Sequence, residues 1–97
     1  MKTLEEIVET IKDLKEEIEK RYKAEIIGVF GSFARGEQKE TSDVDILVDF
    51  QKDATLIDFT GLSIFLEEKL GTRVDIVPKN SVREELKEKI NQEVVKI

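Results

Sequence analysis

Two aspartates, Asp43 and Asp45, flank Val44 in the alternating segment DVDILVDF, residues 43–50. Side chains two residues apart on a strand point to the same side and lie about 6.6 Å apart along the chain. The two carboxylates are therefore predicted to project together from the start of this strand. Like charges this close repel one another, and proteins usually accommodate them by placing a cation between them. Because oxygen is the only donor on offer, Mg²⁺ is the expected cation.

A third aspartate, Asp75, stands in the apolar segment RVDIV, residues 73–77. Its neighbours Val74 and Ile76 must face the core, so the Asp75 side chain is expected on the opposite face of the sheet. If this strand is the neighbour of the strand over residues 43–50, three carboxylates share one surface.

A solvent-exposed sheet face is the alternative explanation, because such a face needs polar side chains and Asp is a common one. Asp is nevertheless a poor strand former, and here it occupies successive same-face positions and recurs on a second strand. The pattern of Asp43 and Asp45 alone leaves both interpretations open. Asp49, at the far end of its strand and without a partner, is assigned to solvent.

Gly31 and Ser32 follow the apolar run EIIGVF, residues 25–30, and open a stretch that can hold one helical turn. Such a turn presents free backbone N–H groups that suit a phosphate, while Gly permits close approach and Ser adds a hydroxyl donor. By itself the Gly-Ser pair is more typical of an ordinary turn than of a phosphate site. Combined with Asp43 and Asp45 on the next strand, it predicts a site for a nucleoside triphosphate with Mg²⁺.

Composition narrows the chemistry and the class of protein. The 97 residues, 39% hydrophobic and 39% charged, suit one folded domain over residues 1–97 without a membrane span. The net charge of −6 argues against broad binding to nucleic-acid phosphates. With no Cys and no His, any chemistry must use carboxylates, hydroxyls and hard metal ions. The acidic N-terminal segment does not resemble a signal peptide, so the expected location is the cytoplasm.

Periodic patterns predict the elements that must position these residues. Apolar residues at helical spacing, with a capping box of Thr3 and Glu6, predict a helix over residues 4–22. Residues 25–30 are typical of a buried strand, and residues 32–35 can form one helical turn. The strand over residues 43–50 is predicted to place Val44, Ile46, Val48 and Phe50 on one face and Asp43, Asp45, Leu47 and Asp49 on the other.

Further along the chain, apolar spacing predicts a second long helix over residues 54–70. Asp53 is its predicted cap and Gly71 its stop. A third strand follows over residues 73–77 and is halted by Pro78.

A capping box of Ser81 and Glu84 is predicted to open a last helix, which continues through Val94. The resulting order is helix, strand, short helix, strand, helix, strand, helix. This order predicts the α/β fold class, with a small mixed sheet of about three strands flanked by helices.

The stretch GSFARGEQKETSDVDILVDF resembles the signature of the DNA polymerase β-like nucleotidyltransferase superfamily, which is Gly-Ser, ten residues, then Asp-x-Asp. Gly31-Ser32 and Asp43-x-Asp45 match it with ten residues between them. Asp75 fits the superfamily's third carboxylate. The resemblance implies a polymerase β-like nucleotidyltransferase core.

The neighbouring residues Ala34-Arg35-Gly36 and Ser42 are similar to one branch of that superfamily. This branch is the minimal nucleotidyltransferase (MNT) antitoxin family, encoded beside HEPN ribonuclease toxins. For Arg35, a contribution of charge to a bound triphosphate and a solvent-facing position both stay open.

The resemblance implies a role for each matched residue. Asp43 and Asp45 would hold two Mg²⁺ ions, one of them also bound by the triphosphate of the substrate ATP. Gly31 and Ser32 would fix the phosphates. Asp75 would complete the second metal site and help to deprotonate an acceptor hydroxyl, which attacks the α-phosphorus and expels diphosphate.

Chain length constrains the acceptor. Larger superfamily relatives carry further domains for RNA, DNA or antibiotics, and 97 residues leave no room for one. The acceptor is therefore expected on a docking protein. Similarity to MNT antitoxins implies a HEPN ribonuclease toxin, neutralised by transfer of AMP to a tyrosine hydroxyl, and an acidic enzyme suits a basic RNA-cleaving partner.

Two other functions stay open. One is an antitoxin that binds its toxin stoichiometrically, with a vestigial nucleotide site. The other is a small-molecule nucleotidyltransferase whose acceptor pocket forms across a dimer. Three clustered carboxylates favour an enzyme, because a pure binding protein has no physical need for them.

Overall fold

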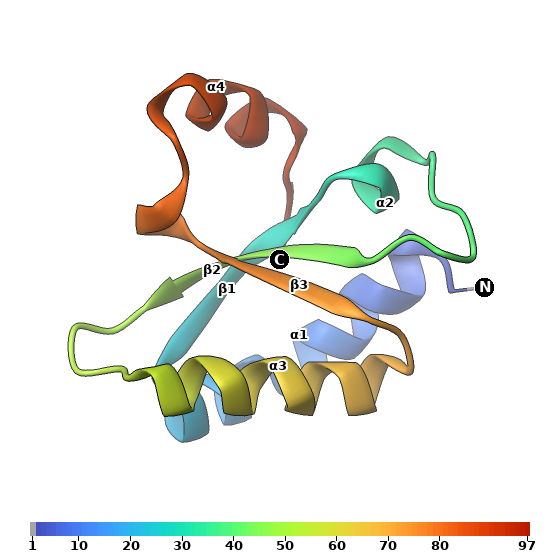
Figure 1. Cartoon of the computed structure of the whole chain (residues 1–97). Helices are drawn as coiled ribbons and strands as arrows, with labels where there is room; N and C mark the ends of the chain where they lie inside the picture. Colours follow the sequence, from blue (N-terminus) through green and yellow to red (C-terminus); the bar gives the residue numbers. More distant parts are fainter. Residues whose placement is uncertain (1) are drawn as a thin grey trace.

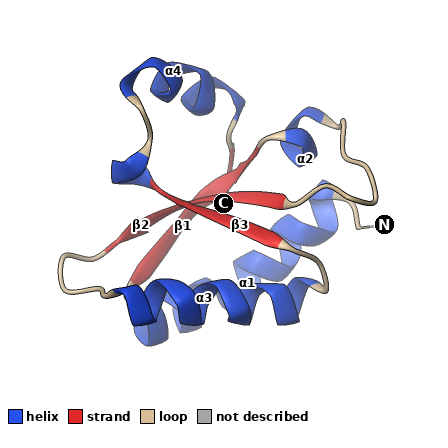
Figure 2. Cartoon of the chain, in the orientation of Figure 1, coloured by secondary structure: helices blue, strands red, loops and turns tan. Residues whose placement is uncertain are grey.

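The computed structural model describes residues 2–97 as a single four-stranded sheet with helices on both faces (Figure 1). The helices are α1 (Leu4–Tyr22), α2 (Ser32–Arg35), α3 (Leu56–Leu70) and α4 (Glu84–Glu93), with a 3₁₀ turn, η1, over Lys79–Ser81. The strands are β1 (Ala24–Phe30), β2 (Val44–Phe50), β3 (Val74–Pro78) and β4 (Val95–Lys96). Figure 2 shows α1 and α3 covering one face of the sheet and α4 standing over the other. The predicted α/β class is confirmed.

The layer of α1 and α3 forms because each helix has one apolar stripe. In α1 the side chains of Ile7, Ile11 and Ile18 are fully buried at helical spacing. The predicted capping box is present, since the Glu6 N–H donates to the Thr3 hydroxyl and the Thr3 N–H donates to the Glu6 carboxylate, both at 3.2 Å. The first helix therefore agrees with its prediction.

The start of α3 differs from its prediction. Its N-cap is Thr55, whose backbone N–H donates to Asp58 at 2.9 Å in a capping box. The prediction of Asp53 as the cap is wrong, because the Asp53 carboxylate is 3.0 Å from the ammonium of Lys23. The end of α3 is as predicted, with Gly71 in the left-handed conformation that glycine adopts readily.

Strand order is β3-β2-β1-β4, with β2 parallel to β3 and both other pairs antiparallel. The side chains of Val44, Ile46 and Val48 point into the core from central β2. Leu47 was predicted on the polar face but is 4% exposed, because Val82 and Ile90 lie over that face and line a cavity with it. That face of the sheet is therefore partly covered.

The chain after Pro78 departs most from prediction. Ser81 lies in η1 and Val82 is extended, so α4 begins only at Glu84 and the predicted capping box of Ser81 and Glu84 is wrong. Val94 is also extended and leads into β4, a fourth strand where the sequence predicted helix. The reason is tertiary, since a two-residue strand carries almost no local signal and forms by pairing with β1.

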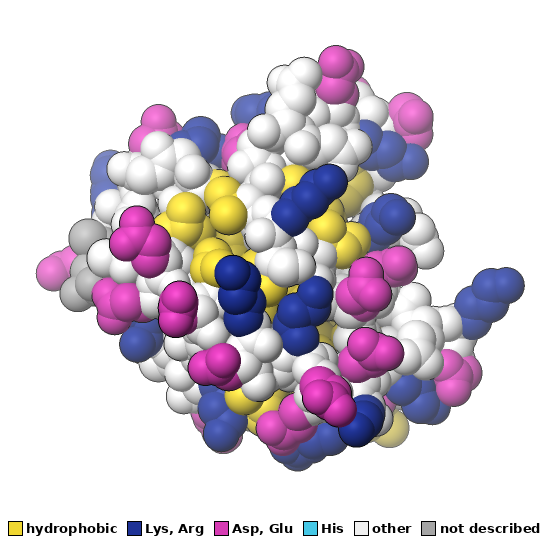
Figure 3. Space-filling view, turned by 180° about the vertical axis from the view of Figure 1, so that it is seen from behind, with side chains coloured by type: hydrophobic (Ala, Val, Ile, Leu, Met, Phe, Trp, Pro, Cys, Tyr) yellow, Lys and Arg dark blue, Asp and Glu magenta, His cyan; other side chains and the backbone are white. Residues whose placement is uncertain are grey.

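Charges are mixed on the face that Figure 3 shows. Several Lys and Arg side chains lie among apolar side chains in the middle of this face, and Asp and Glu side chains lie on both sides of them. None of the helices described over residues 2–97 combines the length and the apolar character that crossing a bilayer requires.

Candidate active site

Neighbouring parallel strands bring two of the predicted carboxylates together. Asp45 on β2 and Asp75 on β3 are Cα partners in the register of the sheet, and adjacent strands lie about 4.8 Å apart. Val44 and Ile46 on β2 and Val74 and Ile76 on β3 are buried beside them, so the two carboxylates leave the sheet on the opposite face. The structure thus confirms that these two strands are neighbours, which the sequence alone left as a condition.

Gly31 lies at the end of β1, against Asp45. Its predecessor Phe30 is the Cα partner of Asp45 across the antiparallel pair. Gly31 has φ 77° and ψ −152°, a conformation essentially restricted to glycine, and a Cβ there would overlap the Asp45 carboxylate. Gly31 is the N-cap of the single-turn helix α2, whose first residue is Ser32. The Gly-Ser turn and the β2 carboxylate are therefore in direct contact.

The Asp45 carboxyl group has an altered acidity. Partial burial, together with the negative charges of Asp75 and Asp43, raises its pKa to about 6, while Arg35 opposes the shift. Asp45 thus carries its negative charge at a position where other negative charges destabilise it. A bound cation would relieve this repulsion.

Asp43 precedes β2 and takes part in a different contact. Its carboxylate is 3.2 Å from the guanidinium of Arg73, and both side chains are exposed. Within residues 2–97 no three acidic, His or Cys side chains are grouped closely enough to hold a metal ion as they stand. The donor set of Asp43, Asp45 and Asp75 fits a hard divalent cation by its chemistry, because it offers only carboxylate oxygens and includes a carboxylate that repulsion destabilises.

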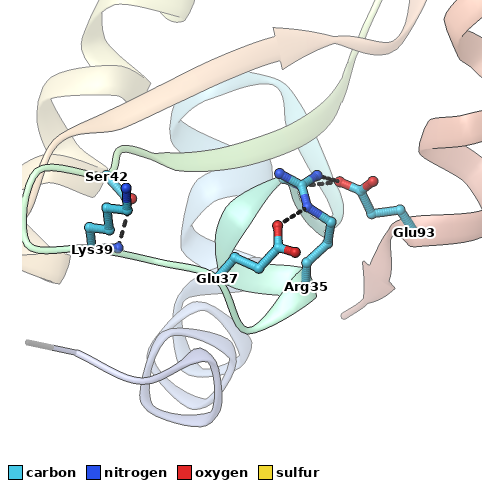
Figure 4. A network of polar contacts seen from close by, with 6 residues as sticks. Arg35, Glu37, Lys39, Ser42 and Glu93 are labelled. Atoms are coloured by element: carbon cyan, nitrogen blue, oxygen red, sulfur yellow. Dashed lines mark hydrogen bonds and ion pairs between the residues drawn. The ribbon is translucent and has the colours of Figure 1, made fainter.

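Figure 4 shows a polar network beside this cluster that sequence analysis did not find. One oxygen of Glu93, at the end of α4, accepts a hydrogen bond from the Gly31 N–H at 2.5 Å and another from Arg35 at 2.8 Å. Arg35 also donates to Glu37 at 2.8 Å, and these two carboxylates raise the pKa of the guanidinium. Arg35 therefore lies in an ion-pair network, with its side chain 42% exposed.

Glu93 gave no usable signal in the sequence. It lies 62 residues from Gly31 and looks like any other acidic residue on a charged helix. Only the pairing of β4 with β1 brings the end of α4 to the Gly-Ser turn. In the loop before β2, the Lys39 N–H donates to the Ser42 hydroxyl at 2.9 Å, so Ser42 stabilises that loop.

Known proteins are similar to this chain over most of its length. The nucleotidyltransferase domain family model matches residues 11–97. A Methanocaldococcus jannaschii protein, provisionally named a protein adenylyltransferase, is 48% identical over 82 residues, which cover 84% of this chain and 95% of that protein. The protein adenylyltransferase MntA of Thermococcus cleftensis is 47% identical over 95 residues, covering 98% of this chain and 96% of MntA.

Two solved structures resemble the fold. One, described as a provisionally identified minimal nucleotidyltransferase, has a TM-score of 0.76 and 39% identity, covering 93% of this chain and 95% of the other. The second is a crystal structure of a toxin–antitoxin with AMP-PNP, with a TM-score of 0.72 and 26% identity, covering 91% of this chain and 69% of the other.

Proposed function

The chain belongs to the nucleotidyltransferase domain family, and from this premise we propose that it is a Mg²⁺-dependent protein adenylyltransferase, transferring AMP from ATP to a partner protein. The observation that carries the proposal is the contact between the Gly-Ser turn and the carboxylate pair. Asp45 packs against Gly31 and lies beside Asp75, its partner on the neighbouring strand β3. A phosphate-binding turn and a cation-binding pair must adjoin in this way to act on one triphosphate.

In the proposed site, Asp43, Asp45 and Asp75 hold the metal, with two ions implied by the family signature. The metal supplies charge neutralisation at the phosphates. Holding it requires Asp43 to leave its exposed ion pair with Arg73, which costs little because such pairs contribute about 0–1 kcal/mol. Gly31 and Ser32 bind phosphate oxygens through a backbone N–H and a hydroxyl.

The proposed reaction is an in-line displacement at the α-phosphorus of ATP. The acceptor hydroxyl oxygen forms the new bond to phosphorus while the bond to the leaving diphosphate breaks. The hydroxyl proton passes to a carboxylate, for which we assign Asp75. Asp75 is exposed, so a hydroxyl carried by a second protein can reach it.

For the partner we propose a HEPN-type ribonuclease toxin that accepts AMP on a tyrosine hydroxyl and loses its activity. Two observations support a toxin. A solved structure of a toxin–antitoxin with AMP-PNP resembles this chain, and the segment Ala34-Arg35-Gly36 is similar to MNT antitoxins. The net charge of −6 suits a basic partner, and we place the reaction in the cytoplasm.

A stoichiometric antitoxin is the second candidate, and one observation favours it. Two groups expected to bind substrate or metal already have partners within the protein, since Gly31 donates to Glu93 and Asp43 pairs with Arg73. Under this hypothesis the protein neutralises the toxin by contact alone. The nucleotide site is then vestigial.

The test uses labelled ATP, Mg²⁺ and a HEPN ribonuclease as the proposed partner. We expect label on the toxin, a mass increase of adenylate and loss of ribonuclease activity, all abolished by Asp45→Asn. Asp49→Asn is the matched control, because it makes the same change on the same strand away from Gly31. Neutralisation by wild type and Asp45→Asn alike, without a mass increase, would establish the stoichiometric antitoxin instead.

A further inference from the structure

The Glu93 carboxylate accepts hydrogen bonds from donors of the kind that bind free anions in proteins. A single oxygen receives the Gly31 N–H at 2.5 Å and the Arg35 guanidinium at 2.8 Å. Its side chain is 13% exposed, whereas Glu37, the other partner of Arg35, is 65% exposed. A backbone N–H and a guanidinium converging on one oxygen are the donors that proteins use for phosphate as well as for carboxylate.

These donors also lie where the proposed function needs them. Gly31 is in contact with Asp45, and the Gly31 N–H is among the groups that would bind a phosphate. A backbone N–H makes one strong hydrogen bond, so it cannot bind Glu93 and a phosphate oxygen together. The free protein and the nucleotide-bound protein must therefore differ at Glu93.

Glu93 is able to leave with little disturbance. No side chain within α4 (Glu84–Glu93) is buried, and β4 stays paired to β1 through Gly28 and Val29. Rotation of the flexible Glu93 side chain is sufficient to free both donors. Glu37 continues to hold Arg35 at 2.8 Å, so the guanidinium keeps its orientation after Glu93 has moved.

We propose that Arg35 and the Gly31 N–H form an anion subsite for a phosphate group of ATP, which the Glu93 carboxylate fills in the free protein and leaves when nucleotide binds. This inference rests on the proposed function for the identity of the nucleotide. In this proposal Arg35 binds the substrate phosphate. Glu93 competes with that phosphate for the same donors, a role that the family signature does not contain.

Glu93→Gln tests the competition, because the amide keeps the shape but loses the charge that pairs with Arg35. We expect Glu93→Gln to bind AMP-PNP with Mg²⁺ about tenfold more tightly by calorimetry, since fewer molecules have the subsite blocked. Adding Arg35→Gln should cancel the gain. Glu88→Gln removes the same charge from α4 at an exposed position and should leave affinity unchanged.

A second probe, inorganic triphosphate, separates this inference from the proposed function. If Glu93→Gln binds triphosphate more tightly but neither protein binds AMP-PNP, the subsite stands and the nucleotide function falls. If both proteins bind AMP-PNP with equal affinity, the competition is refuted and the function survives. Weaker binding of AMP-PNP by Glu93→Gln, together with a lower melting temperature, would show that Glu93 stabilises the Gly31 turn in both the free and the bound protein. That result would also refute the competition.

Discussion

Asp45 on β2 and Asp75 on β3 are direct partners across a parallel pair of strands. Parallel pairing in this register places two carboxylates on one face of the sheet, next to the turn that follows β1. Folding brings them together although their charges repel, and burial together with that repulsion raises the pKa of Asp45 to about 6. An arrangement that is unfavourable in the free protein becomes favourable once a cation binds.

The carboxylate pair should be required for catalysis and not for folding. We expect Asp45→Asn and Asp75→Asn each to lower the rate of AMP transfer by about 10²-fold or more, as at other phosphoryl-transfer sites. Circular dichroism should show both variants folded. Asp49→Asn should keep the wild-type rate within about twofold, a change small beside the cost of losing a catalytic group. Full activity in Asp75→Asn would remove that residue from the site.

The raised pKa of Asp45 predicts a pH dependence of stability. Its folded pKa, about 6, lies above the ordinary 3.8, so the folded state binds this proton more tightly than the unfolded state. The contribution of Asp45 to stability is therefore full below pH about 4 and is lost as pH rises through about 6. Without Mg²⁺, Asp45→Asn should be more stable than wild type by about 1 kcal/mol at pH 8, after allowance for the partial exposure of Asp45.

Thermal unfolding of wild type and Asp45→Asn in a chelator checks this expectation. The difference in melting temperature should shrink steadily between pH 8 and pH 4. A difference that is constant over this range would show that Asp45 has the same pKa in the folded and unfolded protein. Saturating Mg²⁺ should make wild type more stable than Asp45→Asn at pH 8, because only the carboxylate binds the ion.

Replacing Gly31 should cost more than replacing Gly36, another glycine with positive φ. Ala is strained at either position, and more so at Gly31 (φ 77°, ψ −152°) than in the left-handed conformation of Gly36 (φ 72°, ψ 23°). A Cβ at Gly36 meets nothing within 4 Å, whereas a Cβ at Gly31 overlaps the Asp45 carboxylate. We expect Gly36→Ala to destabilise by about 1 kcal/mol and Gly31→Ala by about 2–4 kcal/mol, with loss of AMP transfer. If chemical denaturation shows that Gly31→Ala and Gly36→Ala lower the free energy of unfolding equally, the contact between Gly31 and Asp45 is contradicted.

Gly28 should control the fourth strand. A Cβ at Gly28 would overlap the Val95 carbonyl, so Gly28→Ala is expected to push β4 away from β1. Hydrogen exchange should quicken at the Ile97 amide, which donates to Ile27 at 3.0 Å. Because Glu93 lies two residues before β4 and accepts the Gly31 N–H, exchange at the Gly31 amide should quicken as well. Unchanged exchange at Ile97 would show that β4 tolerates the added methyl group.

Local pattern was sufficient for much of this protein. The helices α1 and α3 and the strand β2 follow from apolar periodicity, because a period of 3.6 or 2 places one stripe or one face in the core. The spacing from Gly31-Ser32 to Asp43 and Asp45 could also be read from the sequence, since these groups lie within one strand-turn-strand segment. The family resemblance rests on those same residues.

Other features were decided only by tertiary structure. The sequence could not state that β3 is parallel to β2 in a register that pairs Asp75 with Asp45, because strand order is set by how the sheet packs on α1 and α3. The same holds for β4, whose two residues have no local pattern. Glu93 reaches Gly31 only through that strand, and a hydrogen bond between residues 62 apart depends on the folded path of the chain rather than on local sequence.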